Sequence, residues 1–188
     1  MDDARTALAA FELEYASLRS SAEKALAQLE PEELRRAPDA DTNSVAVLMK
    51  HVGGNLRSRF KGFLDTDGEK AWRRRDDEFV DDFPPGEAGR AAAHAAWDAG
   101  WRCVAETLAS LRDEDLGRVV STRGEPHSVA RALTRSLAHT AVHCGQIVLV
   151  ARLVAGPGRW STLSIPRGGS AAHNRAMGHG AADGTAAP

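Results

Sequence analysis

The stretch Ser136-Leu-Ala-His-Thr-Ala-Val-His-Cys-Gly-Gln-Ile-Val-Leu-Val-Ala151 is the longest part of the chain without Asp, Glu, Lys or Arg. It predicts the middle of a helix over about residues 128–154, which the glycines and proline at 156–158 would end. His139 and His143 lie four residues apart in it, so a helix would place both on one face. Two imidazoles in that arrangement can bind one metal ion, and a third ligand from another helix would complete a site with open coordination positions.

Three other stretches repeat apolar side chains at intervals of three and four residues, which is typical of amphipathic helices. They cover about residues 8–29, 45–63 and 88–111. Pro31 would end the first, and the polar Asp-Thr-Asn-Ser sequence at 41–44 suits the start of the second. No stretch shows a convincing alternation of the kind found in strands. The sequence therefore predicts an all-α fold, a four-helix bundle with a long connection between helices two and three.

The length of 188 residues suits a single domain with one core. We expect the bundle domain to cover residues 1–165, and the Gly- and Ala-rich tail at 166–188 to be poorly ordered because it has little to bury. The connection at 65–87 is longer than most loops of compact domains. Its aromatic residues, among them Trp72 and Phe79, predict that it packs over the bundle and lines the metal pocket.

The composition indicates an ordinary globular protein, with 43% apolar residues, 27% charged residues and a net charge of −2. This charge does not attract the chain to nucleic acid or to an anionic membrane. The uncharged stretch 136–151 is too short to span a bilayer. The two cysteines are too few for a disulfide scaffold, and the N-terminus lacks the layout of a signal peptide. We therefore expect a cytoplasmic protein with no nucleic-acid or membrane partner.

His51, in the second predicted helix, is the candidate for the third ligand. It follows Ser44 by seven residues, and His139 follows Ser128 by eleven, so each lies close to a whole number of turns from the start of its helix. The alternative is that the histidines are unconnected, each hydrogen-bonded to a neighbour on a half-buried helix face. The pair is not a metalloprotease motif, because Thr140 stands where that motif has its general-base glutamate.

Together these residues resemble the DinB superfamily, to which thiol-dependent transferases of the bacillithiol and mycothiol type also belong. In that superfamily a four-helix bundle carries one histidine from helix two and an H-x-x-x-H pair from helix four, positions that His51, His139 and His143 occupy here. The resemblance implies that these three bind a divalent metal ion such as Zn, Ni or Fe, with a low-molecular-weight thiol as a further cofactor. Four segments also look like one DinB-like subfamily of unknown function: residues 50–56, 66–70, 72–79 and 162–168.

Other residues are candidates for positions around the metal. Asn55 follows His51 by one turn and Gln146 follows His143 by three residues, so either amide could orient a ligand, although such amides also serve as ordinary helix-surface groups. Arg73, Arg74 and Arg75 could bind the carboxylates of a thiol, or could belong to a solvated charge run balanced by the acids at 76–78. Trp72 could form the floor of a substrate pocket, as could Trp97 and Trp101, although aromatic residues at helical spacing also build cores. We expect the remaining histidines not to be ligands: His94, His127, His173 and His179.

The function that the residues and the resemblance imply is a metal-dependent enzyme acting on a small molecule. Its reaction would be the transfer of a thiol to an electrophile, or a hydrolysis, with the metal activating the nucleophile. The alternative is a non-enzymatic stress-response bundle whose metal site is structural or vestigial. The sequence leaves a homodimer open as the assembly.

Overall fold

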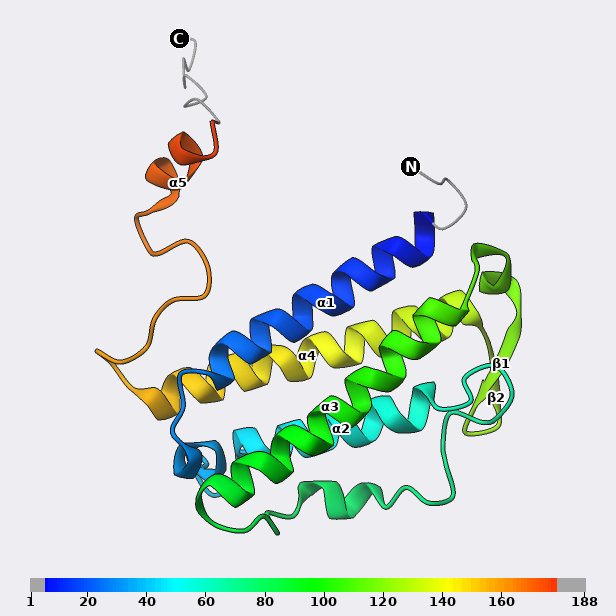
Figure 1. Ribbon diagram of the computed structural model, residues 1–188, viewed down its shortest axis with the longest axis horizontal. Coiled ribbons are helices and arrows are strands. Elements are labelled where there is room, and N and C mark those ends of the chain that lie inside the picture. Colours follow the sequence, from blue (N-terminus) through cyan, green and yellow to red (C-terminus); the bar gives the residue numbers. More distant parts are fainter. Residues whose placement is uncertain (1–5, 179–188) are drawn as a thin grey trace.

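The computed structural model describes residues 6–178, and most of these residues are helical. Four long helices pack together: α1 (Thr6–Leu26), α2 (Val45–Phe60), α3 (Gly86–Ser110) and α4 (Val129–Ala155). Figure 1 shows α1 lying along α4, and α2 lying along α3. The predicted four-helix bundle and its long connection between α2 and α3 are confirmed.

The two helices of each pair run in the same direction. Gly53 of α2 faces Ala96 and Gly100 of α3, and about two turns further along the Phe60 carbonyl accepts a hydrogen bond from Thr107. The connection at 61–85 makes this possible, because it carries the chain back to the end of the bundle where α2 began (Figure 1). Its length is therefore a requirement of the topology.

Polar caps and turns place the starts and ends of the helices close to the expected residues. Ser44 accepts a hydrogen bond from the Val47 amide at the start of α2, and Ser128 caps α4 in the same way. The second helix ends at Phe60, three residues earlier than the apolar pattern predicts, where Gly62 takes a positive φ of 62°. Phe63 still reaches the core, because its ring stacks on Phe60 at 5.5 Å. Apolar core residues thus extend past the end of the helix, which is why their spacing predicted a longer helix.

A small hairpin is the main element that the sequence analysis did not predict. Strands β1 (Val119–Thr122) and β2 (Glu125–Ser128) pair antiparallel, with Arg123 and Gly124 both at positive φ in the turn. The carboxylate of Asp67, in the connection, accepts hydrogen bonds from Ser121 Oγ at 2.6 Å and from both turn amides at 2.8 Å. These hydrogen bonds hold the pKa of Asp67 well below its usual range. They fasten the connection to the hairpin at one end of the bundle.

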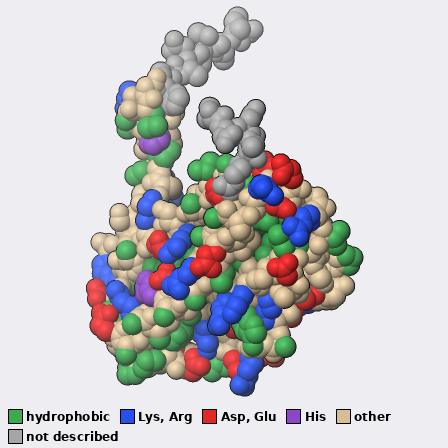
Figure 2. All heavy atoms as spheres, turned by 45° about the vertical axis from the view of Figure 1, so that its right-hand side comes forward, with side chains coloured by type: hydrophobic (Ala, Val, Ile, Leu, Met, Phe, Trp, Pro, Cys, Tyr) green, Lys and Arg blue, Asp and Glu red, His purple; other side chains and the backbone are tan. Residues whose placement is uncertain are grey.

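Three short 3-10 helices complete the bundle: η2 (Pro31–Arg35), η3 (Arg75–Phe79) and η4 (Asp113–Gly117). Beyond it, α5 (Ser170–Ala176) is an exposed helix that stands apart from the other helices (Figures 1 and 2). This short helix lies in the tail at 166–188, for which the composition predicts poor order. Residues 179–188, which belong to the same expectation, lie outside the described residues.

Within residues 6–178, α4 is the one helix whose length and composition would let it cross a membrane. Core helices of water-soluble proteins meet the same criterion, so it is weak support for a membrane span. Here Leu133, Ile147 and Ala151 of α4 are completely buried in the bundle core.

Helices α2 and α3 are in backbone contact at a pair of glycines. A Cβ on Gly100 would lie 2.6 Å from the carbonyl oxygen of Gly53, and a Cβ on Gly53 would lie 2.2 Å from the carbonyl oxygen of Ala96. Real Cβ atoms essentially never approach backbone atoms so closely. Any side chain at either position would therefore push the two helices apart.

We predict that Gly100→Ala lowers the free energy of unfolding by about 1–3 kcal/mol. The reason is that the added methyl group overpacks a contact between two helix backbones, which have no flexible side chain to move aside. Gly145→Ala on α4 is the matched control, since nothing lies within 4 Å of its Cβ position. That exchange should stabilise the protein by about 0.5–1 kcal/mol through the better helix propensity of alanine. Urea denaturation measures both, and equal midpoints for the two variants would contradict this account of the α2–α3 contact.

Candidate metal centre

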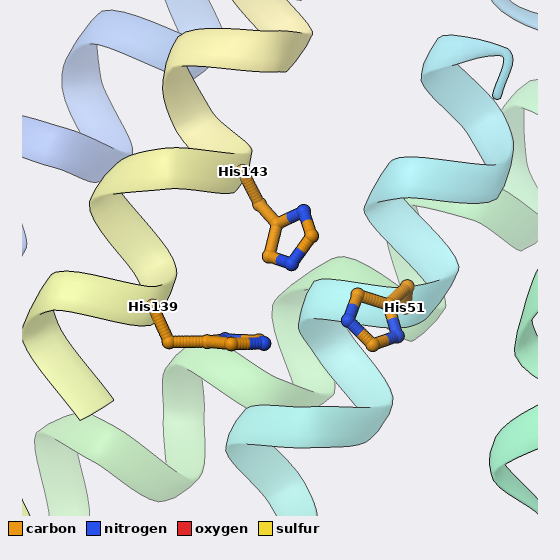
Figure 3. Close-up of side chains that lie close together, drawn as sticks. All are labelled: His51, His139 and His143. Atoms are coloured by element: carbon orange, nitrogen blue, oxygen red, sulfur yellow. The ribbon is translucent and has the colours of Figure 1, made fainter. Parts of the chain in front are cut away.

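Three histidines from two helices converge in the space between α2 and α4. His51 comes from α2, and His139 and His143 come from successive turns of α4 (Figure 3). Each offers one ring nitrogen, and these three nitrogens all lie within 4.8 Å of one another. The ring centroids are 4.5 Å apart for the pair on α4, and 4.7 and 5.5 Å from His51 to His143 and His139. One ion could contact all three after small adjustments of the rings.

His51 is held by a buried carboxylate. Its Nδ1 lies 2.9 Å from Oε2 of Glu78, and its ring packs on Phe79 with centroids 4.5 Å apart. Because the carboxylate accepts, Nδ1 carries the proton and donates it, which leaves the lone pair of Nε2 available for a metal ion. The tautomer that suits a ligand is thus the one that its surroundings favour.

Glu78 stays ionised although it is buried. Burial raises its pKa, but hydrogen bonds from Arg73 and His51 outweigh burial, so the pKa of Glu78 lies below its usual value. Arg73 donates through Nε and Nη2 to both carboxylate oxygens, each at 2.8 Å. The arginine side chain is itself only 1% exposed. The result is a buried chain of contacts from Arg73 through Glu78 to His51, which fixes the His51 ring.

Two adjacent glycines of α2 make room for this arrangement. Gly53 faces the backbone of α3, as described above, whereas a Cβ on Gly54 would lie 2.3 Å from Oε1 of Glu78. The second glycine therefore admits the carboxylate against the helix. Since successive residues of a helix are about 100° apart, two neighbouring glycines can serve two different neighbours.

The two histidines of α4, His139 and His143, are also in a protonation state that allows metal binding. Burial above all, together with the nearby His143 and His51, lowers the pKa of His139 to about 4. Burial also lowers the pKa of His143, against the effect of its hydrogen bond with Gln146. That bond joins Nδ1 of His143 to Oε1 of Gln146 at 2.8 Å. Both imidazoles are therefore neutral at pH 7, and neutral imidazoles are ligands that suit Zn, Ni and Fe.

A cavity of about 450 Å³ opens beside the three histidines. Its walls come from α2, from the connection between α2 and α3, from the hairpin and from α4. Arg73, Arg75 and Phe79 are the residues of the connection that line it, which confirms the prediction that this connection lines the pocket. The volume is in the range of small-molecule sites.

The other candidate residues divide between the cavity and the opposite side of the connection. Asn55 is buried and lines the cavity. Arg75 is half-exposed and lines it too. Trp72 and Arg74 do not line it; both belong to a separate surface hollow, where Trp72 packs against the Arg57 guanidinium at 4.6 Å. Arg74 is 82% exposed and pairs with Asp77. Consecutive residues of the irregular segment before η3 point in different directions, so Arg73 and Arg75 face the cavity and Arg74 does not.

Two residues of the site escaped the sequence analysis. Glu78 is the last of three consecutive acids at 76–78, for which the sequence favours a solvated charge run as much as a site, yet it is buried, whereas the Asp76 side chain is 98% exposed. No signal in a single sequence distinguishes these carboxylates. His127, expected to be no ligand, lies outside the three-histidine group but is buried and lines the cavity. Its place follows from the hairpin, which the sequence did not reveal.

Comparison with known proteins identifies the family of the chain. A family model described as "Protein of unknown function (DUF1572)" matches residues 2–169. No curated protein and no solved structure matches the chain. The matched range contains all three histidines and Glu78.

We predict that His139→Ala abolishes stoichiometric binding of a divalent metal and leaves the helix content unchanged, because the bundle is stabilised mainly by apolar packing. His94→Ala is the control, since His94 lies on α3 outside the three-histidine group. Elemental analysis after metal loading, with circular dichroism for the fold, measures both. Equal metal content in the two variants would remove His139 from the ligand set.

A second prediction concerns the carboxylate behind His51. Glu78→Gln keeps the shape of the side chain but removes the charged acceptor, so metal affinity should fall about 10–100-fold. Asp76→Asn, in the same 3-10 helix but in solvent, should leave the affinity unchanged. Competition with a chromogenic chelator gives both values. Unaltered affinity in the Glu78 variant would show that the His51 contact does not tune the site.

Proposed function

Because the chain belongs to the DUF1572 family, whose function is unknown, we propose its function from the site itself: a divalent-metal-dependent enzyme that activates a nucleophile for attack on a small molecule. The observation that supports this most is a group of three histidines beside an open cavity of about 450 Å³. Three protein ligands leave coordination positions for water or substrate, whereas structural sites usually fill theirs with protein atoms.

The chemistry of the bound ion would be to lower the pKa of a water or thiol and so to supply a nucleophile at neutral pH. The residues of the chain have separate tasks around it. His51, His139 and His143 would hold the ion, with Glu78 and Gln146 orienting two of the rings. The connection, through Phe79, covers one side of the site and reduces its contact with solvent.

We further propose that the family is part of the DinB superfamily. The support is the position of the histidines, one on the second helix and an i, i+4 pair on the fourth, in a bundle whose second and third helices are joined by a long connection. Within that proposal the reaction is the transfer of a low-molecular-weight thiol to an electrophile, or a hydrolysis. The protein would act in the cytoplasm on a small molecule, with no nucleic-acid or membrane partner.

The competing function is a non-enzymatic bundle in which the metal is structural or vestigial. The open cavity argues against it, since a structural site has no need of a hollow in contact with its ligands. The two functions differ in a measurable way. A structural metal contributes to stability and has no turnover, whereas a catalytic metal accelerates a reaction.

We predict that the protein loaded with Zn, Ni or Fe accelerates either conjugation of a small thiol to a chromogenic electrophile or hydrolysis of an activated ester. Chelation should abolish the rate and metal readdition should restore it, because the nucleophile depends on the ion. His139→Ala should be inactive, and His94→Ala should retain the rate. Full metal occupancy without turnover across several thiols, electrophiles and esters would favour the non-enzymatic function.

A further inference from the structure

The cavity beside the three histidines has an unusual charge. None of the described residues that line it is acidic, and five are arginines: Arg59, Arg73, Arg75, Arg123 and Arg135. Figure 2, by contrast, shows acidic and basic side chains interspersed over the outer face in view. The chain as a whole has a net charge of −2. The excess of positive charge is thus local to the cavity.

Carboxylates behind the lining offset only part of this charge. Glu78 pairs with Arg73, and a single carboxylate, Glu69, lies 3.3 Å from Arg59 and 2.9 Å from Arg123. Two guanidinium groups therefore share one close carboxylate. Glu69 also lies 3.7 Å from Arg73, which divides its charge further.

The remaining two arginines have only weak partners. Arg75 lies 3.5 Å from Asp76, whose side chain is 98% exposed, and Arg135 lies 3.8 Å from Glu125, whose side chain is 60% exposed. Exposed pairs at such distances contribute little, because water screens them. These guanidinium groups retain donors for a ligand.

Buried and aromatic neighbours hold two of these guanidinium groups in place. The buried His127 accepts a hydrogen bond at Nε2 from Nη1 of Arg135 at 3.1 Å, because arginine can only donate. This contact positions the guanidinium of Arg135 without neutralising it. Arg75 lies over the ring of Phe79 at 4.9 Å, and this ring carries no charge that could neutralise it. Both arginines are thus oriented and still positively charged.

We propose that this cavity binds the anionic group of a small molecule, a carboxylate or a phosphate, through Arg75, Arg123 and Arg135. The inference deepens the proposed function and rests on it for the role of the bound molecule as a substrate or co-substrate. Guanidinium groups match the geometry of both anions. A volume of about 450 Å³ suits a small molecule. The anionic group binds at the arginines, and the reactive part of the molecule extends toward the histidines.

Calorimetry on the full chain tests the proposal without relying on turnover. The metal-free protein at low ionic strength is titrated with succinate, with inorganic phosphate and with neutral succinamide. We expect one of the two anions to bind and succinamide not to bind. Binding of succinate alone identifies a carboxylate-bearing ligand, and binding of phosphate alone identifies a phosphorylated one.

Arg135→Gln should weaken the binding of that anion about tenfold to a hundredfold, because a charge-assisted contact is lost. Arg123→Gln should do the same. Arg74→Gln is the matched control, since Arg74 belongs to the same arginine run as Arg75 but does not line the cavity. The substituted side chains are about half or more exposed, so the variants should fold, which circular dichroism verifies.

The proposal is overturned if neither anion binds, or if the Arg135 and Arg74 variants bind equally well. Failure of the proposed function is distinguished from failure of the anion site by comparing anion binding with the metal-dependent reaction. If the metal-free protein binds an anion but no metal-dependent reaction is found, the cavity site stands and the enzyme does not. If a metal-dependent reaction is found but neither anion binds, the enzyme stands and the anion site does not.

Discussion

The backbone contact between α2 and α3 is the constraint on which the rest of this structure depends. Gly53 and Gly100 allow the two helices to touch without side chains between them. Because about 200° of helix rotation separates His51 from Gly53, seating one side of α2 on α3 directs His51 to the opposite side, toward α4. The packing of two helices and the position of a metal ligand are therefore decided together.

The next glycine of α2 explains why a charged group can be buried beside the site. Gly54 leaves a space on α2, and Glu78 fills it from the connection between α2 and α3. A buried carboxylate is costly unless it is paired and hydrogen-bonded, and Arg73 and His51 meet both conditions. Such a pair adds little stability compared with an apolar replacement, so its value lies in fixing the His51 ring. The long connection thus serves the topology and the site at once.

The electrostatics of the site also follow from how separate elements meet. The histidine pair on α4 is neutral, with the pKa of His139 lowered to about 4 mainly by burial, so the protein contributes no positive charge at the ligand atoms of that pair. Arginines from α2, the connection, the hairpin and α4 supply positive charge across the cavity instead. A metal-dependent enzyme that uses an anionic substrate would need this division, with neutral donors for the ion and cationic donors for the anion.

Sequence alone determined the helices, because apolar spacing and capping residues act within a few turns of chain. It identified four helices, the connection, the histidines at 51, 139 and 143, and Gln146 as a neighbour of His143. Tertiary structure alone decided which of three consecutive acids is buried, which members of an arginine run face the cavity, and that a hairpin brings Arg123 and His127 beside α4. The physical reason is that the environment of a charged side chain depends on what packs across from it. Here those neighbours come from segments as far apart as α2 and α4, and no local pattern records them.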